Sequence, residues 1–243
     1  MSGDTLMSAR DTREIEAVIF DMDGLMLDTE RIALRVVAEA AAGLGYPWRA
    51  EIGLAMVGLN ARDSDAVAAA HLGPAYPVEP LRDAFAVRYQ HALESEPIPH
   101  KPGLLELLAW IEGQPLVKAV ATSTKRERAQ LKLTRAGLIG RFPVLVGGDE
   151  VERGKPAPDI FLAAAAGLGV NPRHCLVLED SSPGVRGALA AGMQVIMVPD
   201  VLPATQEIVA LGHPVCESLQ AALTLLSERV GRPGLHASPR PLG

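Results

Sequence analysis

Cysteine is scarce in this chain, and the sequence has neither a long apolar run nor an excess of basic residues. Its two cysteines, Cys175 and Cys216, match neither a CxxC pair nor the spacing of a zinc site, so we expect buried thiols in a reducing compartment. No stretch is as long and apolar as a membrane span, and residues 1–17 lack the apolar segment of a signal peptide. These absences predict a cytoplasmic protein without a membrane partner.

The net charge of the chain is negative. It is −6, whereas proteins that bind nucleic acid backbones usually present basic patches, so nucleic acid is not expected as the main partner. A small phosphorylated ligand is compatible with this charge, because a local positive site can exist within an acidic protein. The 48% of apolar and 21% of charged residues indicate a folded chain, and 243 residues suit one large domain or a core with an insertion.

Five short apolar segments alternate with helical patterns along most of the chain. The segments expected as strands are residues 17–20, 118–121, 144–146, 175–178 and 195–198. The helices expected between and beside the later strands are residues 103–112, 125–136, 158–168 and 183–191. This alternation predicts an α/β fold, in which a doubly wound parallel sheet is covered by helices on both faces.

The interval from about residue 30 to residue 96 breaks the alternation, because it contains no convincing strand. Its alanine-rich patterns predict helices at residues 30–44, 62–72 and 80–93. We therefore expect an inserted helical cap domain at 30–97, a discontinuous core at 14–29 and 98–228, and flexible tails at 1–13 and 229–243. Ligands of open α/β sheets bind beyond the carboxyl ends of the strands, so the cap should move over such a site on hinges near 28–31 and 97–101.

Polar side chains follow four of the expected strands near the point where each strand ends. They are Asp21 and Asp23 after the first, Thr122, Ser123 and Thr124 after the second, Lys155 past the third, and Glu179 and Asp180 after the fourth. Because the strands are parallel, these groups should meet at one edge of the sheet. Gly24 should allow the tight turn that brings both aspartates there, and Thr124 should also help to cap the following helix.

Four clustered carboxylates would repel one another and raise each other's pKa. A divalent cation removes this conflict, and oxygen ligands without His or Cys indicate Mg²⁺ rather than zinc. Mg²⁺ would orient a phosphate, and Lys155 and the Thr122 hydroxyl could hold its remaining oxygens. An aspartate could then attack phosphorus, while Asp23 protonates the leaving oxygen and later activates water. The residues thus predict a magnesium-dependent phosphotransfer enzyme.

In this order the motifs resemble those of the haloacid dehalogenase superfamily: the DxDG of residues 21–24, a Thr/Ser after the second strand, the GKPxPD lysine and a terminal Glu-Asp pair. The helical block after residues 28–30 resembles the helical-cap, β-phosphoglucomutase-like branch of phosphatases. The resemblance implies a Rossmann-like core, Asp21 as nucleophile and Asp23 as acid/base. It also implies Mg²⁺ ligands from Asp21, the Asp23 backbone carbonyl, Glu179 and Asp180. By the same match, the phosphate contacts would be Thr122, Ser123, Thr124 and Lys155, of which Thr122 and Lys155 would share in catalysis.

The expected activity is hydrolysis of a small phosphorylated metabolite, such as a sugar, polyol or nucleotide-like phosphate, through an aspartyl-phosphate, by a monomer. The alternative is a β-phosphoglucomutase-like phosphomutase, although mutase relatives carry a cap histidine where this chain has Ala33. A dehalogenase would need neither the metal nor Asp23, and a non-catalytic phosphoprotein would need neither Asp23 nor a lid. Arg62, near the start of a cap helix, is expected either to be exposed to solvent or to contact substrate.

Overall fold

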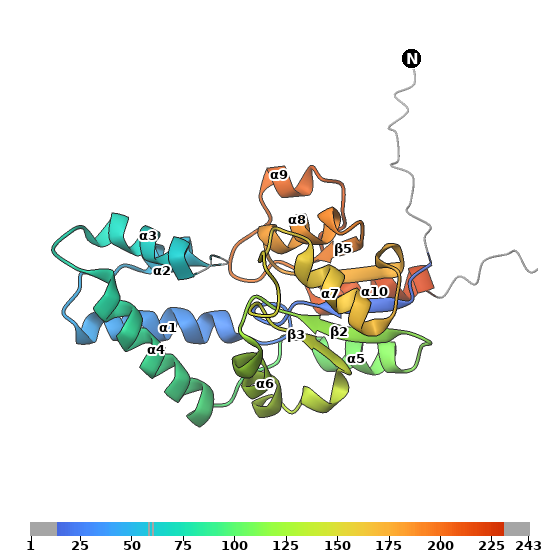
Figure 1. Cartoon of the computed structure of the whole chain (residues 1–243), viewed down its shortest axis with the longest axis horizontal. Coiled ribbons are helices and arrows are strands. Elements are labelled where there is room, and N and C mark those ends of the chain that lie inside the picture. The colour runs from blue at the N-terminus through green and yellow to red at the C-terminus, as the bar shows by residue number, and fades with distance from the viewer. Residues whose placement is uncertain (1–13, 58, 60, 231–243) are drawn as a thin grey trace, which may run out of the picture.

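The computed structural model describes residues 14–57, 59 and 61–230, and its centre is a five-stranded parallel sheet (Figure 1). The strands are β1 (Ala17–Phe20), β2 (Val117–Ala121), β3 (Val144–Val146), β4 (Cys175–Glu179) and β5 (Gln194–Met197). They lie in the order β3-β2-β1-β4-β5, so the chain builds outward from β1 in both directions. The predicted doubly wound α/β core is confirmed, and every expected strand is present.

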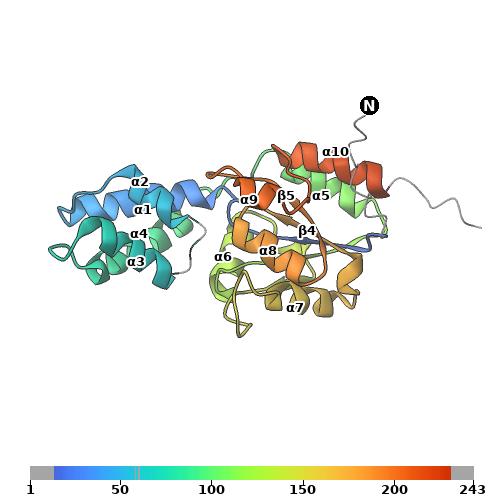
Figure 2. The ribbon, with the colours of Figure 1, turned by 90° about the horizontal axis from the view of Figure 1, so that it is seen from above.

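Helices cover both faces of this sheet, as Figure 2 shows. One face packs against α5 (Leu104–Glu112), α6 (Arg126–Arg135) and α10 (Leu219–Val230), and the other against α7 (Asp159–Leu168) and α8 (Ser182–Ala190). The shorter helices are α9 (Gln206–Val209) and the 3₁₀ turns η1 (Ile139–Arg141) and η2 (Pro172–His174). Val18 and Phe20 of β1 point to the first face and Ala17 and Ile19 to the second, which is why this strand is apolar throughout.

The interval after β1 folds as four helices with a small apolar core of their own. They are α1 (Thr29–Gly43), α2 (Ala50–Met56), α3 (Ala61–Leu72) and α4 (Val78–Ser95). Val37, Ala40, Ile52 and Leu81 are among the buried residues between them. The sequence did not predict α2, because this short helix contains Gly53, a poor helix former. Gly53 is nevertheless placed where α2 approaches the side chain of Leu34 of α1 closely.

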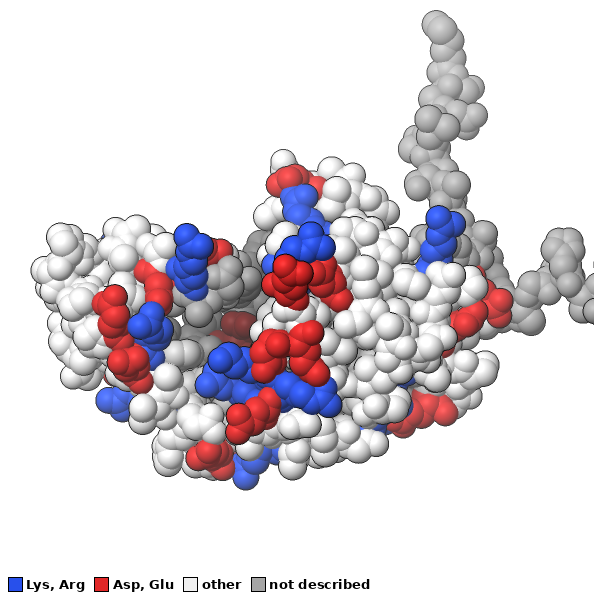
Figure 3. Space-filling view, viewed as in Figure 1, with Lys and Arg blue, Asp and Glu red and all other residues white. Residues whose placement is uncertain are grey.

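Two chain segments connect the helical insertion with the sheet, and they run side by side. The backbone N–H of Asp28 donates to the Pro99 carbonyl at 2.9 Å, and that of Lys101 donates to the Met26 carbonyl at 2.9 Å. On the face drawn in Figure 3, a recess separates the insertion from the core, and acidic side chains are visible inside it. The insertion therefore stands beside the carboxyl ends of the strands, where the sequence places the polar residues.

The ends of the described chain qualify two of the sequence-based expectations. Residues 1–13 and 231–243, expected as tails, lie outside the described residues, whereas Arg229 and Val230 belong to α10 and extend the core beyond its expected end at 228. None of the helices within residues 14–230 combines the length and the apolar character that a membrane crossing requires.

Candidate active site

The register of the sheet brings the polar residues of three strands to one edge. Phe20, the last residue of β1, pairs with Val120 on β2 and with Leu178 on β4. The next residue of each strand therefore lies at the same level, which places Asp21 between the end of β2 and Glu179. Asp21 is held there by its backbone N–H, which donates to the Leu178 carbonyl at 3.0 Å.

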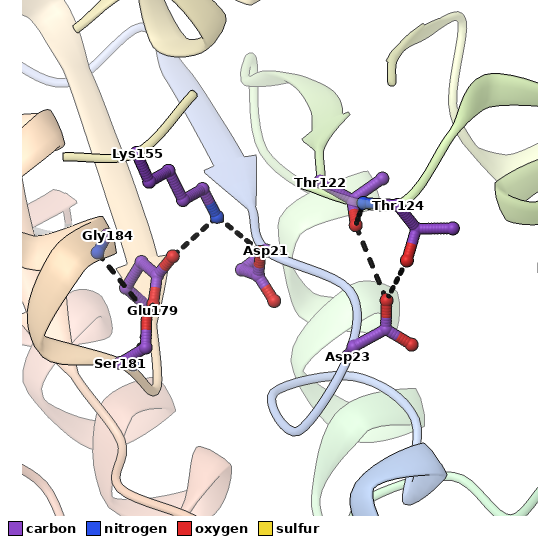
Figure 4. Close-up of polar contacts among 8 residues, drawn as sticks. All are labelled: Asp21, Asp23, Thr122, Thr124, Lys155, Glu179, Ser181 and Gly184. Carbon is purple, nitrogen blue, oxygen red and sulfur yellow. Dashed lines mark hydrogen bonds and ion pairs between the residues drawn. The ribbon is translucent and has the colours of Figure 1, made fainter. Parts of the chain in front are cut away.

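Lys155 joins two of the carboxylates at this edge (Figure 4). Its ammonium group donates to Asp21 Oδ1 and, at 2.5 Å, to Glu179 Oε1. Burial by itself would lower the pKa of Lys155, but the charges of Asp21 and Glu179 outweigh it and raise the pKa, so the lysine remains protonated. The predicted proximity of Lys155 to the carboxylates of the first and fourth strands is thus present in the structure.

The second oxygen of Glu179 is fixed by the start of α8. Glu179 Oε2 accepts hydrogen bonds from the Ser181 backbone N–H at 2.7 Å and from the Ser181 hydroxyl at 2.9 Å. The same hydroxyl accepts from the Gly184 N–H at 3.2 Å and so caps the helix. A Cβ on Gly184 would lie 1.7 Å from Glu179 Oε1, so only glycine leaves room for this fully buried carboxylate.

The turn after β1 supports the second carboxylate of the Glu-Asp pair. Gly24 has a φ of +83°, a left-handed conformation that favours glycine, and it makes the turn that the sequence predicts. A Cβ at this position would approach Asp180 Oδ2 to 2.2 Å. Gly24 therefore serves both the turn geometry and the close approach of Asp180.

Asp21, Glu179 and Asp180 form a cluster whose chemistry fits a divalent cation. Each offers a carboxylate oxygen, and these oxygens lie within 4.8 Å of one another. Burial, reinforced by the charge of Glu179, raises the pKa of both Asp180 and Asp21, although Lys155 opposes the shift. One ammonium group cannot balance three carboxylates. A hard cation bound by oxygen would complete the charge balance, and Mg²⁺ prefers such ligands.

Asp23 points away from this cluster, toward the end of β2 (Figure 4). Its Oδ2 accepts from the hydroxyls of Thr124 at 2.6 Å and Thr122 at 3.4 Å, and its Oδ1 accepts from Thr29 at 2.5 Å and from Lys132 Nζ at 2.6 Å. Burial would raise the pKa of Asp23, but the charge of Lys132 and these hydrogen bonds outweigh it and lower the pKa. The Asp23 side chain is therefore a fully paired carboxylate outside the acidic cluster.

The hydroxyl residues after β2 have different surroundings. Thr122 is buried, and its hydroxyl accepts from the Thr124 backbone N–H at 3.1 Å. The expectation that Thr124 caps the following helix is wrong: the cap position of α6 is Lys125, which makes no side-chain cap bond, and the Thr124 hydroxyl is turned to Asp23. Ser123 is exposed, and its hydroxyl has no hydrogen-bond partner among the described residues. A phosphate contact of Ser123 stays a prediction.

Arg62 lies in the first turn of α3, and its side chain is exposed. Of the two alternatives that the sequence left open, exposure to solvent or contact with substrate, the structure without a ligand shows exposure to solvent. A substrate contact of Arg62 stays a prediction. The neighbouring residues 58 and 60 lie outside the described part of the chain.

Sequence reasoning missed Lys132, which lies at this site although α6 is mostly polar. The buried residues of α6 are Ala129, Lys132 and Leu133, so the lysine interrupts the apolar stripe of the helix. The sequence does contain a signal for this, because a lysine at a core-facing position of a helix indicates a buried ion pair: lysine is almost never buried unless it is paired. Its partner, however, comes from a distant segment and is visible only in the fold.

A parallel α/β core with a lysine and three clustered carboxylates at its strand ends, two of them buried, is typical of a class of enzymes that act on phosphate groups. The sequence matches the haloacid dehalogenase-like hydrolases over residues 18–198. A phosphorylated carbohydrates phosphatase of Thermotoga maritima is 33% identical over 74% of this chain and 83% of its own length.

Two solved structures extend this likeness to three dimensions. The crystal structure of CbbY from Rhodobacter sphaeroides in complex with phosphate is 29% identical, with a TM-score of 0.70 over 85% of this chain and 95% of that one. A β-phosphoglucomutase from Clostridium difficile shares the fold at 22% identity, with a TM-score of 0.72 over 89% of this chain and 97% of its own. The chain belongs to the haloacid dehalogenase-like hydrolases, and the prediction of an enzyme of this family is confirmed.

Proposed function

We propose that this protein is a Mg²⁺-dependent phosphatase that hydrolyses a small phosphorylated metabolite through an aspartyl-phosphate on Asp21. The observation that carries the proposal is the contact of Lys155 with both Asp21 and Glu179 at the centre of the acidic cluster. This arrangement keeps Asp21 buried and oriented, and a cationic group beside it can receive the oxygens of a phosphate.

Asp21 is the proposed nucleophile because Glu179, the other carboxylate that Lys155 contacts, is fully buried and has its second oxygen held by Ser181. Its oxygen forms a bond to phosphorus while the bond from phosphorus to the ester oxygen breaks. The Asp23 carboxyl group gives its proton to the departing oxygen and becomes a carboxylate. In the second step Asp23 takes a proton from water, the water oxygen bonds to phosphorus, and the bond to Asp21 breaks to release inorganic phosphate.

Asp23 is suited to this exchange by its surroundings. At rest the Thr124 hydroxyl and Lys132 hold it as a carboxylate, which is the form that a general base needs. The arrival of a negatively charged phosphate beside it favours uptake of a proton by like-charge repulsion, which supplies the acid form. Thr122 and Lys155 are the core groups within reach of the phosphate oxygens.

The metal would be held by Asp21, Glu179 and Asp180, with the Asp23 backbone carbonyl as a further proposed ligand. When bound, Mg²⁺ neutralises the carboxylates and stabilises negative charge on the phosphate. Neighbouring residues determine where the metal would bind. Gly184 and Ser181 fix the position of Glu179, and Gly24 leaves room for the Asp180 side chain.

A phosphorylated sugar is the substrate class that the comparisons favour, because the Thermotoga maritima relative is named for phosphorylated carbohydrates. We further propose that residues 30–97 act as a cap that selects the ester, and that the enzyme works as a cytoplasmic monomer. The alternative phosphomutase activity would use the same core groups.

The test is release of inorganic phosphate from a panel of phosphorylated sugars, polyols and nucleotides, measured with Mg²⁺ and with EDTA. Asp21→Asn, purified in the same way, is the control for contaminating phosphatases. We expect turnover of at least one sugar phosphate by the unaltered protein with Mg²⁺ alone. Equal phosphate release by Asp21→Asn would refute the proposal.

A further inference from the structure

Lys132 is a buried cation that neither the acidic cluster nor the phosphate-holding residues use. We propose that Lys132 is a positioning residue that sets the orientation of the Asp23 carboxylate and links it to the cap. The inference rests on the proposed function, since it assigns Asp23 the acid/base role. It adds a residue that acts through Asp23 without touching the phosphate.

The contacts of Asp23 distinguish Lys132 from its other partners. Thr29 and Thr124 are neutral donors on opposite oxygens, at 2.5 Å and 2.6 Å, and they fix the plane of the carboxylate. Lys132 Nζ, at 2.6 Å from Oδ1, is the only ion-pair partner of Asp23 among the described residues, and the lysine side chain is 3% exposed. The negative charge of Asp23, whose side chain is 18% exposed, is thus balanced by this one buried side chain.

Without Lys132, the balance of charge at the site would change in a definite direction. Lys155, a second lysine with a buried side chain, binds Asp21 and Glu179 on the opposite side of the site. A buried carboxylate that loses its cation is drawn toward the remaining positive groups, here Lys155 and a bound metal ion. Asp23 would then compete with Asp21 and the phosphate for these groups instead of facing the leaving oxygen.

Lys132 also touches the cap. Its Nζ lies 5.4 Å from the centroid of the Tyr89 ring, on the cap helix α4, while the lysine itself belongs to the core helix α6. The Tyr89 side chain is almost fully buried in this contact. Movement of α4 would therefore change the surroundings of the lysine that orients Asp23. This arrangement makes the position of the acid/base group depend on the position of the cap.

The chain offers a closely matched control in Lys118. This lysine is also largely buried, its Nζ lies 3.0 Å from Glu112 Oε1, and it stands over an aromatic ring, 5.9 Å from the centroid of Phe142. Lys118 lies near the start of β2, at the opposite end of the strand from Thr122. Lys118→Met and Lys132→Met thus remove the same kind of interaction. Lys118→Met removes it at a distance from the site, and Lys132→Met removes it within the site.

The experiment measures kcat and KM for 2,4-dinitrophenyl phosphate and for a sugar phosphate that the screen identifies. We expect Lys132→Met to lower kcat for the sugar phosphate by about 10-fold to 100-fold, because a misplaced acid/base group forfeits much of its effect. The loss should be smaller for kcat/KM of the dinitrophenyl ester, whose leaving group departs without a proton. Inhibition by inorganic phosphate should not change, and Lys118→Met should retain the kcat of the unaltered enzyme. Lys132→Arg, which keeps the charge, should recover most of the activity.

A double-mutant cycle with Asp23→Ala decides whether Lys132 acts through Asp23. In the Asp23→Ala background, Lys132→Met should change the residual kcat for the dinitrophenyl ester by less than about twofold. An equal loss in both backgrounds would show a merely structural lysine and overturn the inference. Lys132→Gln takes the place of the methionine variant in the same cycle if the latter does not fold.

The phosphatase activity and the positioning role of Lys132 are refuted by different results. The proposed phosphatase function is refuted if Mg²⁺ does not increase phosphate release by the unaltered protein and Asp21→Asn releases phosphate at the same rate. Normal turnover with additive effects of Lys132→Met and Asp23→Ala leaves the phosphatase intact and removes the positioning role.

Discussion

The core and the cap contribute to the candidate site in different ways. On the core side, Asp21, Lys155 and Glu179 are buried and each makes ion pairs or hydrogen bonds that fix its orientation. On the side of the helical insertion, the site is contacted by Thr29, at the start of α1, and by Tyr89 of α4, which packs against Lys132. The difference shows that the charged groups of the site are supplied by the strand ends, and it agrees with the proposal that the helical insertion selects the ester.

The largest effect should follow from the nucleophile. Asp21→Asn keeps the shape of the side chain but replaces the carboxylate by a very poor nucleophile. We expect kcat to fall by several orders of magnitude, on the order of 10⁴-fold or more, with the fold retained. Steady-state phosphate release measures the loss, and circular dichroism checks the fold. Residual activity above about one per cent would assign the nucleophile to another group.

Removal of the metal should abolish activity, apart from what metal left in the solution supports. Asp21, Glu179 and Asp180 repel one another without a cation, so EDTA should stop turnover and Mg²⁺ should restore it. Ca²⁺ should bind the same oxygens yet inhibit, because it takes more ligands at longer distances than Mg²⁺. Both effects can be followed by titrating each ion into chelated enzyme. Full activity in EDTA would contradict the metal assignment.

A single methyl group near the metal site should have an intermediate effect. In Gly184→Ala the added Cβ would fall 1.7 Å from Glu179 Oε1, so the carboxylate has to move from its place. We expect the apparent affinity for Mg²⁺ to fall by about 10-fold to 100-fold, as for other changes to groups that orient metal ligands. Gly140→Ala is the control, because its Cβ would meet nothing within 4 Å. Equal Mg²⁺ affinity in both variants would show that Glu179 is not a ligand.

The sequence predicted the strands and the carboxylates because both follow short-range rules. A parallel sheet brings strand ends together, so Asp21 and Glu179 could be placed from the chain order alone. Lys132 and Gly184 could not, since their roles depend on how α6 and α8 pack against the sheet. The same limit hid Asp200, which follows β5 and forms ion pairs with Arg31 and Lys101.

Asp200 provides a smaller test, directed at the cap rather than the core. Its side chain is 2% exposed and pairs with Arg31 at 2.9 Å and with Lys101, one residue from each segment that joins cap and core. Asp200→Asn should loosen both segments, alter both kcat and KM, and lower kcat/KM by about two- to fivefold. Small-angle X-ray scattering, with and without a phosphate analogue, should show two interdomain arrangements whose balance the variant shifts. One identical arrangement under all conditions would refute cap movement.

The smallest expected effect concerns the choice between hydrolysis and isomerisation. A mutase has to keep water from its phosphorylated aspartate until the sugar has turned around. Mutase relatives use a cap histidine for this, and Ala33, half-buried on α1, offers neither a donor nor an acceptor at that position. Net hydrolysis should therefore dominate. Ala33→His should raise isomerisation only slightly, because Thr29 and Lys132 already occupy Asp23 Oδ1.

The measurement follows ³¹P signals of a hexose 1-phosphate with a trace of the hexose bisphosphate. Inorganic phosphate should accumulate faster than hexose 6-phosphate in the unaltered enzyme, and the ratio should shift by less than about twofold in Ala33→His, since one group cannot rebuild the closed site. Ala33→Ser is the control for a polar group without an imidazole. Faster accumulation of hexose 6-phosphate by the unaltered protein would make it a mutase. The cap would then supply its coupling group from a position other than residue 33.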